Sequence, residues 1–294
     1  MATNILVTGA TGTQGGAVID SLLGGEYGEF EVFGLTRDAS SDAATALDAR
    51  GVTLVEGDMT DADAMRTAVD GMDAVFAVTT FFEAGPEAER EQGITLADAA
   101  LEAGVEHFVL SSVGSADADT GLAHFESKAD VEAYVAELGL PATVLRPVFF
   151  LQNFEAMLRS EIEDGRLPLA LSPETELAVV DARDIGRAAA AALADPERFL
   201  GETITLAGDS LTTAEMAAAF ADALGREVEP IALDVDDYRA AAGDEMADMF
   251  VWFDEVGYDV DPDALRAEYG IETTDLETYL AESEVWKPVG TAVN

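Results

Sequence analysis

The residues Gly9-Ala10-Thr11-Gly12-Thr13-Gln14-Gly15-Gly16 follow directly on the apolar run Ile5-Leu6-Val7, and a helical stretch from Ala17 to Leu23 comes next. In this order of strand, turn and helix, one glycine permits a positive φ, one lets the backbone approach a pyrophosphate, and one allows close helix–strand packing. The helix N-terminus then faces the phosphates. The pattern predicts a dinucleotide-binding turn; the structural alternative is a tight turn and nothing more.

Short apolar runs recur along the first half of the chain, with helical stretches between them. Strands that alternate with helices indicate a parallel sheet, and runs that are apolar at consecutive positions indicate that helices cover both sheet faces. We therefore expect an α/β fold, a Rossmann-type doubly wound parallel sheet with a smaller C-terminal domain. The expected strands are Ile5–Val7, Val32–Leu35, Val52–Val55, Ala74–Val78, Phe108–Leu110 and Ala142–Leu145.

The pattern changes after Pro147, where an aromatic segment and a helical stretch from Asn153 to Asp164 follow. We expect a nucleotide-binding domain over residues 1–152, to which residues 175–208 return at the sheet edge through strands at Glu176–Val180 and Thr203–Leu206. Residues 153–174 and 209–294 would form a smaller substrate or lid domain. Its aromatic residues Trp252, Phe253 and Tyr258 suit either an apolar pocket or the core of the lid.

The charge balance is strongly acidic, with 59 Asp and Glu against 15 Lys and Arg and a formal net charge of −44. Such a chain repels phosphate backbones and anionic bilayers, so we expect neither a nucleic-acid partner nor membrane docking. The acids are spread along the chain, and only two lysines occur, Lys128 and Lys287. This distribution favours a salt-adapted protein, although an acidic protein of an ordinary cytoplasm is the alternative.

Other classes are excluded by composition. The chain has no cysteine, which excludes disulfides, thiolate catalysis and Cys-based metal sites, and its two histidines lack metal-ligand spacing. No basic leader precedes the first apolar run, and no uninterrupted apolar run reaches about 18 residues. We expect a cytoplasmic protein without a resident metal.

Arg37 stands at the end of the second expected strand, where an NAD enzyme usually places a carboxylate that binds the ribose diol. A guanidinium there can pair with a 2′-phosphate, so the sequence favours NADP(H) over NAD(H). This interpretation has two alternatives. In one, Arg37 is only a solvated surface residue; in the other, the charge of the neighbouring Asp38 disfavours binding of the phosphate.

Several motifs together resemble the NmrA-like family of atypical short-chain dehydrogenases/reductases, and the similarity spans nearly the whole chain. The spacing Gly-x-x-Gly-x-x-Gly is a variant used by short-chain dehydrogenases/reductases. The motifs that carry the resemblance are Gly9–Gly16, Thr36-Arg37-Asp38, Glu56-Gly57-Asp58, His124-Phe125-Glu126-Ser127-Lys128, Val131–Tyr134, Leu145-Arg146-Pro147, Phe150–Asn153, Asp184-Ile185-Gly186 and Leu211–Glu215.

The resemblance implies roles for individual residues around a dinucleotide. The turn would cradle the pyrophosphate, Arg37 would meet the ribose phosphate, and Lys128 would reach the nicotinamide ribose. The full set implied for the cofactor is Gly9, Ala10, Thr11, Gly12, Thr13, Gln14, Gly15, Arg37, Asp58, Met59, Thr79, Thr80, Phe81, Lys128, Phe150, Leu151, Gln152 and Asn153. Thr79 and Thr80 have a plainer role as strand-end residues, Asp58 as a helix cap, and the phenylalanines as core. The chain departs from some relatives at Glu91, where they carry a lysine, unless Arg90 substitutes for it.

The candidate catalytic residues are Lys128 and His124. Most short-chain dehydrogenases use Tyr-x-x-x-Lys, and here His124 takes the tyrosine's place four residues before the lysine. An imidazole with an ordinary pKa near 6.5 suits proton donation, although hydride transfer to a quinone or dye needs no protein acid, and His124 would otherwise only pack a helix start. Ser111 and Ser112 end the fifth strand near the position of a substrate-orienting serine, or simply satisfy strand-end backbone groups.

The resemblance implies two functions of different kinds. The family includes NADPH-dependent quinone- and dye-reducing enzymes, isoflavone-reductase-like relatives, and non-catalytic members that sense the NADPH/NADP ratio. We expect an NADPH-dependent reductase of a small planar acceptor; the alternative is a redox sensor that regulates a protein partner. A nucleotide-sugar epimerase is a weaker third interpretation, because it ordinarily needs the missing tyrosine.

Overall fold

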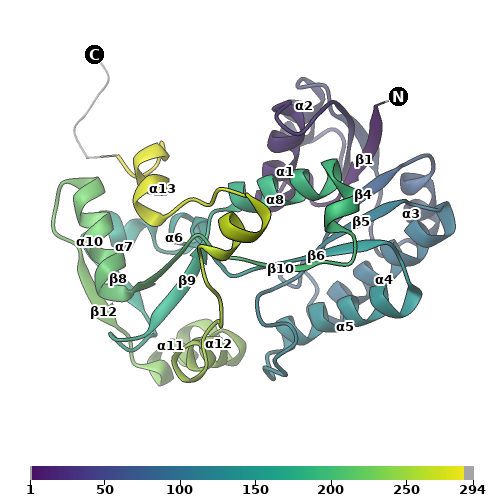
Figure 1. Cartoon of the computed structure of the whole chain (residues 1–294). Helices are drawn as coiled ribbons and strands as arrows, with labels where there is room; N and C mark the ends of the chain where they lie inside the picture. The colour runs from purple at the N-terminus through teal and green to yellow at the C-terminus, as the bar shows by residue number, and fades with distance from the viewer. Residues whose placement is uncertain (1, 288–294) are drawn as a thin grey trace, which may run out of the picture. The chain divides into compact units, whose positions relative to one another are not determined.

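The computed structural model describes residues 2–287, and the chain divides into two compact units. The first unit comprises the chain up to Pro147 together with Ile185–Thr205, and the second comprises Val148–Asp184 and the chain from Leu206 onward. The chain first passes from one unit to the other at Pro147, where the sequence pattern changes. Each unit is described by itself below (Figure 1).

A seven-stranded sheet organises the first unit, in the order β10-β6-β5-β4-β1-β2-β3. In this order, each pair of neighbouring strands between β6 and β3 is parallel, as the sequence predicts. Because β1 lies between β4 and β2, the turn that follows β1 lies among the carboxyl ends of three neighbouring strands. The strands are β1 (Thr3–Val7), β2 (Phe30–Thr36), β3 (Thr53–Glu56), β4 (Ala74–Val78), β5 (His107–Ser111), β6 (Ala142–Pro147) and β10 (Thr203–Leu206).

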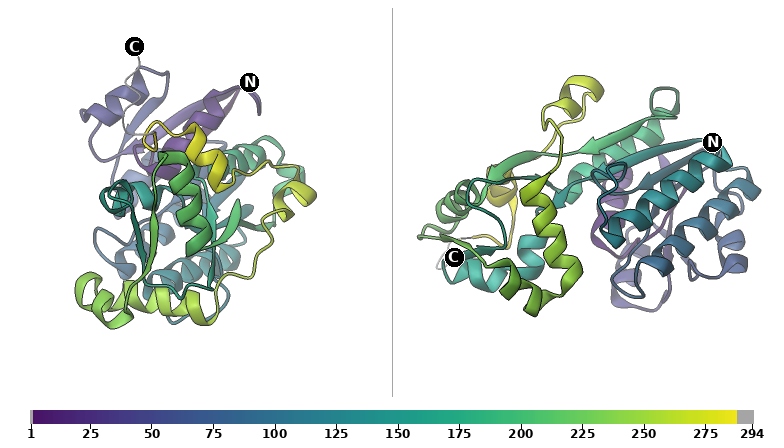
Figure 2. Two further views of the ribbon diagram at one scale, coloured as in Figure 1. Left: turned by 90° about the vertical axis from the view of Figure 1, so that its left-hand side faces the viewer. Right: turned by 90° about the horizontal axis from the view of Figure 1, so that it is seen from below.

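Helices cover both faces of this sheet, which confirms the doubly wound α/β fold. On one face, buried side chains of the strands such as Leu6 and Phe108 form one cluster with α3, α4 and α5. Figures 1 and 2 show α4 and α5 side by side there, with α1 and α8 on the opposite face. A Cβ on Gly186 of α8 would lie 2.3 Å from the Ala17 carbonyl oxygen of α1, so only glycine allows these two helices to pack this closely. The helices are α1 (Thr13–Leu23), α2 (Asp42–Asp48), α3 (Ala62–Val69), α4 (Pro86–Ala103), α5 (Ala123–Leu138), α8 (Ala182–Ala194) and α9 (Pro196–Phe199).

The two helices beside the candidate site, α4 and α5, have clear start and stop signals. Pro86 opens α4, where its missing N–H is no loss, and Gly104 ends it in the left-handed region with a φ of 74°. Gly139 ends α5 in the same way, with a φ of 66°. Within residues 2–287 no helix combines the length and the apolar character needed to cross a membrane.

The second unit is built on two small sheets. In the first, β9 (Glu176–Val180) pairs antiparallel with β11 (Asp209–Thr212) and parallel with β7 (Phe149–Phe150). In the second, β8 (Arg166–Leu169) and β12 (Glu229–Ala232) are parallel. The helical segments are α6 (Gln152–Met157), α7 (Arg159–Glu163), α10 (Thr213–Leu224), α11 (Val235–Ala242), α12 (Asp244–Glu255), the π-helical turn η1 (Leu265–Tyr269) and α13 (Leu276–Glu282).

The second unit differs from expectation in two places. The run Glu176–Val180 does not join the edge of the large sheet; β10 does, whereas β9 forms the centre of the small sheet. The single helix expected from Asn153 to Asp164 is two helices, because the backbone departs from helical geometry at Leu158, which has φ −122° and ψ 5°.

Aromatic packing fills the interior of the second unit. The rings of Trp252, Phe253 and Tyr258 lie 5.2–5.7 Å apart, centre to centre, and Phe253 also packs on Phe149. Trp252 and Phe253 are buried in these contacts. This packing supports the interpretation of these residues as core of the second unit.

Candidate functional site

The glycine turn has the geometry that the sequence predicts. Gly9 has a φ of 57°, and its carbonyl accepts a hydrogen bond from the N–H of Gly12 at 2.8 Å. A Cβ on Gly15 would lie 2.2 Å from that same carbonyl oxygen, so the third glycine permits close packing of α1 on the turn. The outer residues Thr11 and Gly12 are exposed, whereas Ala10 is buried beneath them.

The N-terminus of α1 opens at this turn. Its N-cap residue is Gly12, which brings no side chain to bond the first N–H groups of the helix. Those groups and the positive end of the helix dipole form a site that suits an anion. The turn can therefore hold a phosphate group without any cationic side chain.

Side chains join the carboxyl ends of β1, β4 and β5. The Thr8 hydroxyl donates to the Val78 carbonyl at 3.0 Å and accepts from the Val78 N–H at 2.8 Å. The Ser111 hydroxyl donates to Oε1 of Gln14 at 2.6 Å, so the predicted cofactor residue Gln14 is tied to β5. The next serine, Ser112, has a buried hydroxyl without a hydrogen-bond partner among the described residues.

Arg37 and Asp58 lie beyond the ends of β2 and β3, and both are engaged within the protein. The Arg37 guanidinium makes a two-fold hydrogen-bonded ion pair with Glu83, in which Nη2 lies 2.7 Å from Oε1. The Asp58 carboxylate accepts from the N–H and the hydroxyl of Thr60 at 2.9 and 2.7 Å. These hydrogen bonds hold the pKa of Asp58 below its usual value. Met59 beside it is half-buried against the core.

Lys128 sits in a buried polar cluster at the end of β4. Its Nζ lies 2.8 Å from Oε1 of Glu89 and 3.4 Å from the Thr79 hydroxyl. The Glu89 side chain is fully buried and also accepts hydrogen bonds from Thr79 and from Ser127. Thr79 and Lys128, two predicted cofactor residues, are thus brought together, and one carboxylate orients both.

Glu89 is the residue that sequence reasoning missed. It lies on α4 four, seven and eight residues before Gly93, Leu96 and Ala97, so it shares their buried face. A carboxylate in the apolar stripe of a helix is the signal that could have identified it. Glu91, at the position where some relatives carry a lysine, is exposed, and Arg90 is paired with Asp130 at 3.0 Å, so neither residue joins this cluster.

His124 lies in the first turn of α5 and packs between aromatic rings. Its ring stacks on Phe81 with centroids 4.7 Å apart and meets Phe125 edge-on at 4.8 Å. The side chain is buried. Phe81, which is half-buried in the loop after β4, therefore covers the imidazole of His124 at the position of the usual tyrosine. In the same loop, the Thr80 hydroxyl accepts a hydrogen bond from the Phe82 N–H at 3.4 Å.

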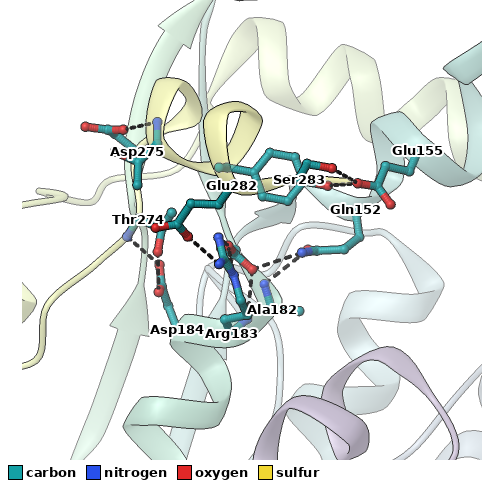
Figure 3. Close-up of polar contacts among 12 residues, drawn as sticks. Gln152, Glu155, Ala182, Arg183, Asp184, Thr274, Asp275, Glu282 and Ser283 are labelled. Carbon is teal, nitrogen blue, oxygen red and sulfur yellow. Dashed lines mark hydrogen bonds and ion pairs between the residues drawn. The ribbon is translucent and has the colours of Figure 1, made fainter. Parts of the chain in front are cut away.

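The remaining predicted residues, Phe150 to Asn153, belong to the second unit. Leu151 is fully buried there, and the Gln152 amide is used at both ends. Its Nε2 donates to the buried Asp181 at 2.9 Å, and its Oε1 accepts from the N–H of Ala182 at 3.1 Å (Figure 3). Gln152 thus has a structural role at the start of α8.

The C-terminal segment of the second unit meets the same helix start (Figure 3). Asp184, which is fully buried, accepts from the N–H and the hydroxyl of Thr274 at 2.8 and 3.0 Å. Arg183 pairs with both Asp181 and Glu282. Despite these acidic side chains, residues 2–287 contain no group of three Asp, Glu or His side chains arranged to hold a metal ion.

Comparison with known proteins identifies relatives over most of the chain. The sequence profile of the NmrA-like family matches residues 1–280. An NAD(P)H azoreductase from Xenophilus azovorans is 32% identical over 81% of this chain and 79% of its own length. A solved NADPH-dependent quinone oxidoreductase from Escherichia coli, in complex with NADPH, is 26% identical with a TM-score of 0.81, over 94% of this chain and 98% of that one. NmrA, a negative transcriptional regulator solved in complex with NADP, is 25% identical with a TM-score of 0.78, over 96% of this chain and 95% of that one.

Proposed function

Since the chain belongs to the NmrA-like family, we propose that it is an NAD(P)H-dependent reductase that transfers hydride to a small planar acceptor such as a quinone. The observation that carries the proposal is the placement of the largely buried Lys128 against a fully buried carboxylate. This residue is one of two lysines in the chain, and a fully buried glutamate holds it in the same unit as the glycine turn. The names of the azoreductase and quinone oxidoreductase relatives support the reaction class.

The residues of the first unit fit a reduced dinucleotide. The turn and the N-terminus of α1 would take the pyrophosphate, and the ammonium of Lys128 would donate to the hydroxyls of the nicotinamide ribose. Arg37 is the cation that we propose for a 2′-phosphate, which is the basis for proposing that NADPH is preferred over NADH. The glycine turn supports binding of either dinucleotide, so the proposed preference rests on Arg37 and not on the turn.

Electrons and protons balance in the proposed reaction. Bound NAD(P)H supplies a hydride, which is two electrons and one proton, and a quinone that also takes up one further proton becomes a hydroquinone. That proton comes from solvent or from His124, whose ring is held by Phe81 and Phe125. The chain's own part is to bind the dinucleotide and to orient it through Lys128 and Thr79.

A second candidate function is a redox sensor that binds NADPH and NADP differently and regulates a protein partner. The observation that favours it is His124, because the position of the usual catalytic tyrosine holds a ring packed between two phenylalanines. The NADP-bound negative transcriptional regulator among the relatives supports it as well. In this function the ligands shift a conformational equilibrium by their difference in affinity for two states.

The test is steady-state oxidation of NADPH and NADH against a panel of quinones, azo dyes and aldehydes, with dinucleotide binding followed in parallel by fluorescence. We expect oxidation that depends on at least one quinone or dye and that is lost in the Gly12→Val variant. Dinucleotide binding without oxidation by any member of the panel would favour the sensor. Failure to bind either dinucleotide would overturn both candidates.

A further inference from the structure

The Arg37–Glu83 ion pair links the ends of two strands that flank the glycine turn. Arg37 follows β2 and Glu83 lies in the loop that follows β4, and β1 runs between those two strands. The pair therefore passes across the carboxyl end of β1, where the glycine turn begins. It joins the two sides of the turn that the proposed function assigns to the dinucleotide.

The geometry of the pair matches what a phosphate would need. A carboxylate and a phosphate both present two oxygens to the parallel N–H groups of a guanidinium, and Glu83 already occupies both Nη atoms of Arg37. The hydrogen bonds and the charge of Glu83 raise the pKa of Arg37, and those of Arg37 lower the pKa of Glu83, so both groups stay charged near neutral pH. Two ligands of the same geometry cannot hold the same face of one guanidinium together.

The other nearby acids make their hydrogen bonds elsewhere, although the charge of Asp58 also acts on Arg37. Asp38 accepts from the N–H and the hydroxyl of Ser40 at 2.8 and 2.6 Å, and Asp58 is bonded to Thr60. Glu56 accepts from the Ala39 N–H at 3.2 Å. Glu83 is thus the acid that the described structure places on the guanidinium.

We propose that Glu83 is a specificity-determining residue that competes with the 2′-phosphate of NADPH for the Arg37 guanidinium. This inference rests on the proposed function, because it concerns how the same site chooses between two dinucleotides. A 2′-phosphate that takes the same two Nη atoms of Arg37 must displace Glu83, whereas NADH, which has a diol at that position, binds with the ion pair intact. In this way Glu83 makes the difference in affinity between NADPH and NADH smaller than Arg37 alone would give.

The test compares dissociation constants of NADPH and NADH for the full chain and the Glu83→Gln variant at low ionic strength. Because the displaced pair is exposed, with side-chain exposures of 64% for Arg37 and 48% for Glu83, the expected effect is modest. NADPH should bind roughly three- to five-fold more tightly to the variant, and NADH should change by less than about two-fold. Glu87→Gln is the matched control, since Glu87 is an exposed acid of the adjoining α4 and removal of its charge should leave the NADPH/NADH ratio unchanged.

A double-variant cycle tests the route through Arg37. In an Arg37→Gln background the preference for NADPH should fall, and the added Glu83→Gln change should no longer alter the ratio. An unchanged ratio in Glu83→Gln, an equal change for both dinucleotides, or weaker NADPH binding would overturn the inference and leave the proposed function standing. Failure of the unaltered protein to bind either dinucleotide would overturn both.

Discussion

The ammonium of Lys128 lies 2.8 Å from Oε1 of Glu89, whose side chain has no exposed surface, while 13% of the Lys128 side chain is exposed. The two residues come from different helices, α5 and α4, and their charges compensate each other inside the first unit. A change of Lys128 alone therefore has two effects, because it removes a proposed cofactor contact and leaves a buried carboxylate without its cation.

The first prediction separates these two effects. Lys128→Met should lower the free energy of unfolding by on the order of 3 kcal/mol, because Glu89 stays buried and uncompensated. The double variant Lys128→Met with Glu89→Gln should recover most of that stability, since the amide is neutral, its oxygen can accept from one of the hydroxyls of Thr79 and Ser127, and its NH2 group can donate to the other. Dinucleotide binding should be weakened in both variants. Urea unfolding and fluorescence titration measure the two quantities, and a double variant that binds as tightly as the unaltered protein would remove Lys128 from the site.

The glycine turn gives a second prediction, because Gly12 and Gly15 should fail in different ways. Gly12 has a negative φ of −97°, and a Cβ there would lie 3.3 Å from the nearest atom, the Gly9 carbonyl oxygen. Gly12→Val should therefore cost less stability than a change at Gly15, and it should lose dinucleotide binding because its side chain blocks approach of the pyrophosphate. Gly15→Ala should instead destabilise the fold, since its Cβ would lie 2.2 Å from the same oxygen. Thermal unfolding and binding titrations of both variants check this contrast; equal behaviour would contradict it.

His107 gives a prediction about pH. This residue starts β5, at the end of the strand away from the glycine turn, and its Nε2 lies 2.8 Å from the Thr143 hydroxyl. Burial lowers the pKa of His107 from 6.5 to about 4. The unfolded chain therefore binds a proton that the folded chain excludes, and the contribution of His107 to stability is full above pH 6.5 and is lost as the pH falls toward 4.

The matched variant is His107→Gln, which keeps a polar atom near Thr143 but does not titrate. Between pH 7 and pH 4 the unaltered protein should lose on the order of 2 to 3 kcal/mol more unfolding free energy than this variant. Because the carboxylates titrate in both proteins, the difference isolates His107. Parallel pH profiles of urea unfolding would show that this histidine is not buried in its neutral form.

The net charge of −44 leads to a prediction about salt. Repulsion among distributed carboxylates weakens the compact state, and the Debye length falls from about 10 Å at 0.1 M salt to about 3 Å at 1 M. The unfolding temperature should therefore rise between 0.1 and 1 M KCl. Sucrose at matched osmolality is the control for solvent exclusion, since it does not screen charge. A flat or falling unfolding temperature in KCl would contradict adaptation to salt.

Much of the first unit could be predicted from the sequence because its signals are local. Each strand from β1 to β6 is a short apolar run, and the glycine turn carries its own backbone requirements at Gly9 and Gly15. Lys128 stood out because lysine is nearly absent from the chain. Glu89 was missed because an acid on a helix is ordinarily solvated, and its burial depends on partners 10 and 38 residues away in the chain.

The second unit was harder to predict because its pairings are long-range. The run Glu176–Val180 looks like any buried strand, and only its partners, β7 and β11, show to which sheet it belongs. Gln152 likewise matches a family motif, but its contacts with Asp181 and Ala182 require two segments about 30 residues apart to meet. No pattern within either segment indicates that meeting.

The most direct test of the proposed reaction is a single turnover in which a preformed complex with NADPH is mixed rapidly with a benzoquinone or an azo dye in molar salt. The absorbance of the reduced nicotinamide reports the hydride. We predict that it disappears in proportion to the acceptor added, and that the Gly12→Val variant shows no such loss. A complex that forms but keeps its reduced nicotinamide with every acceptor would contradict hydride transfer and leave the sensor as the function to pursue.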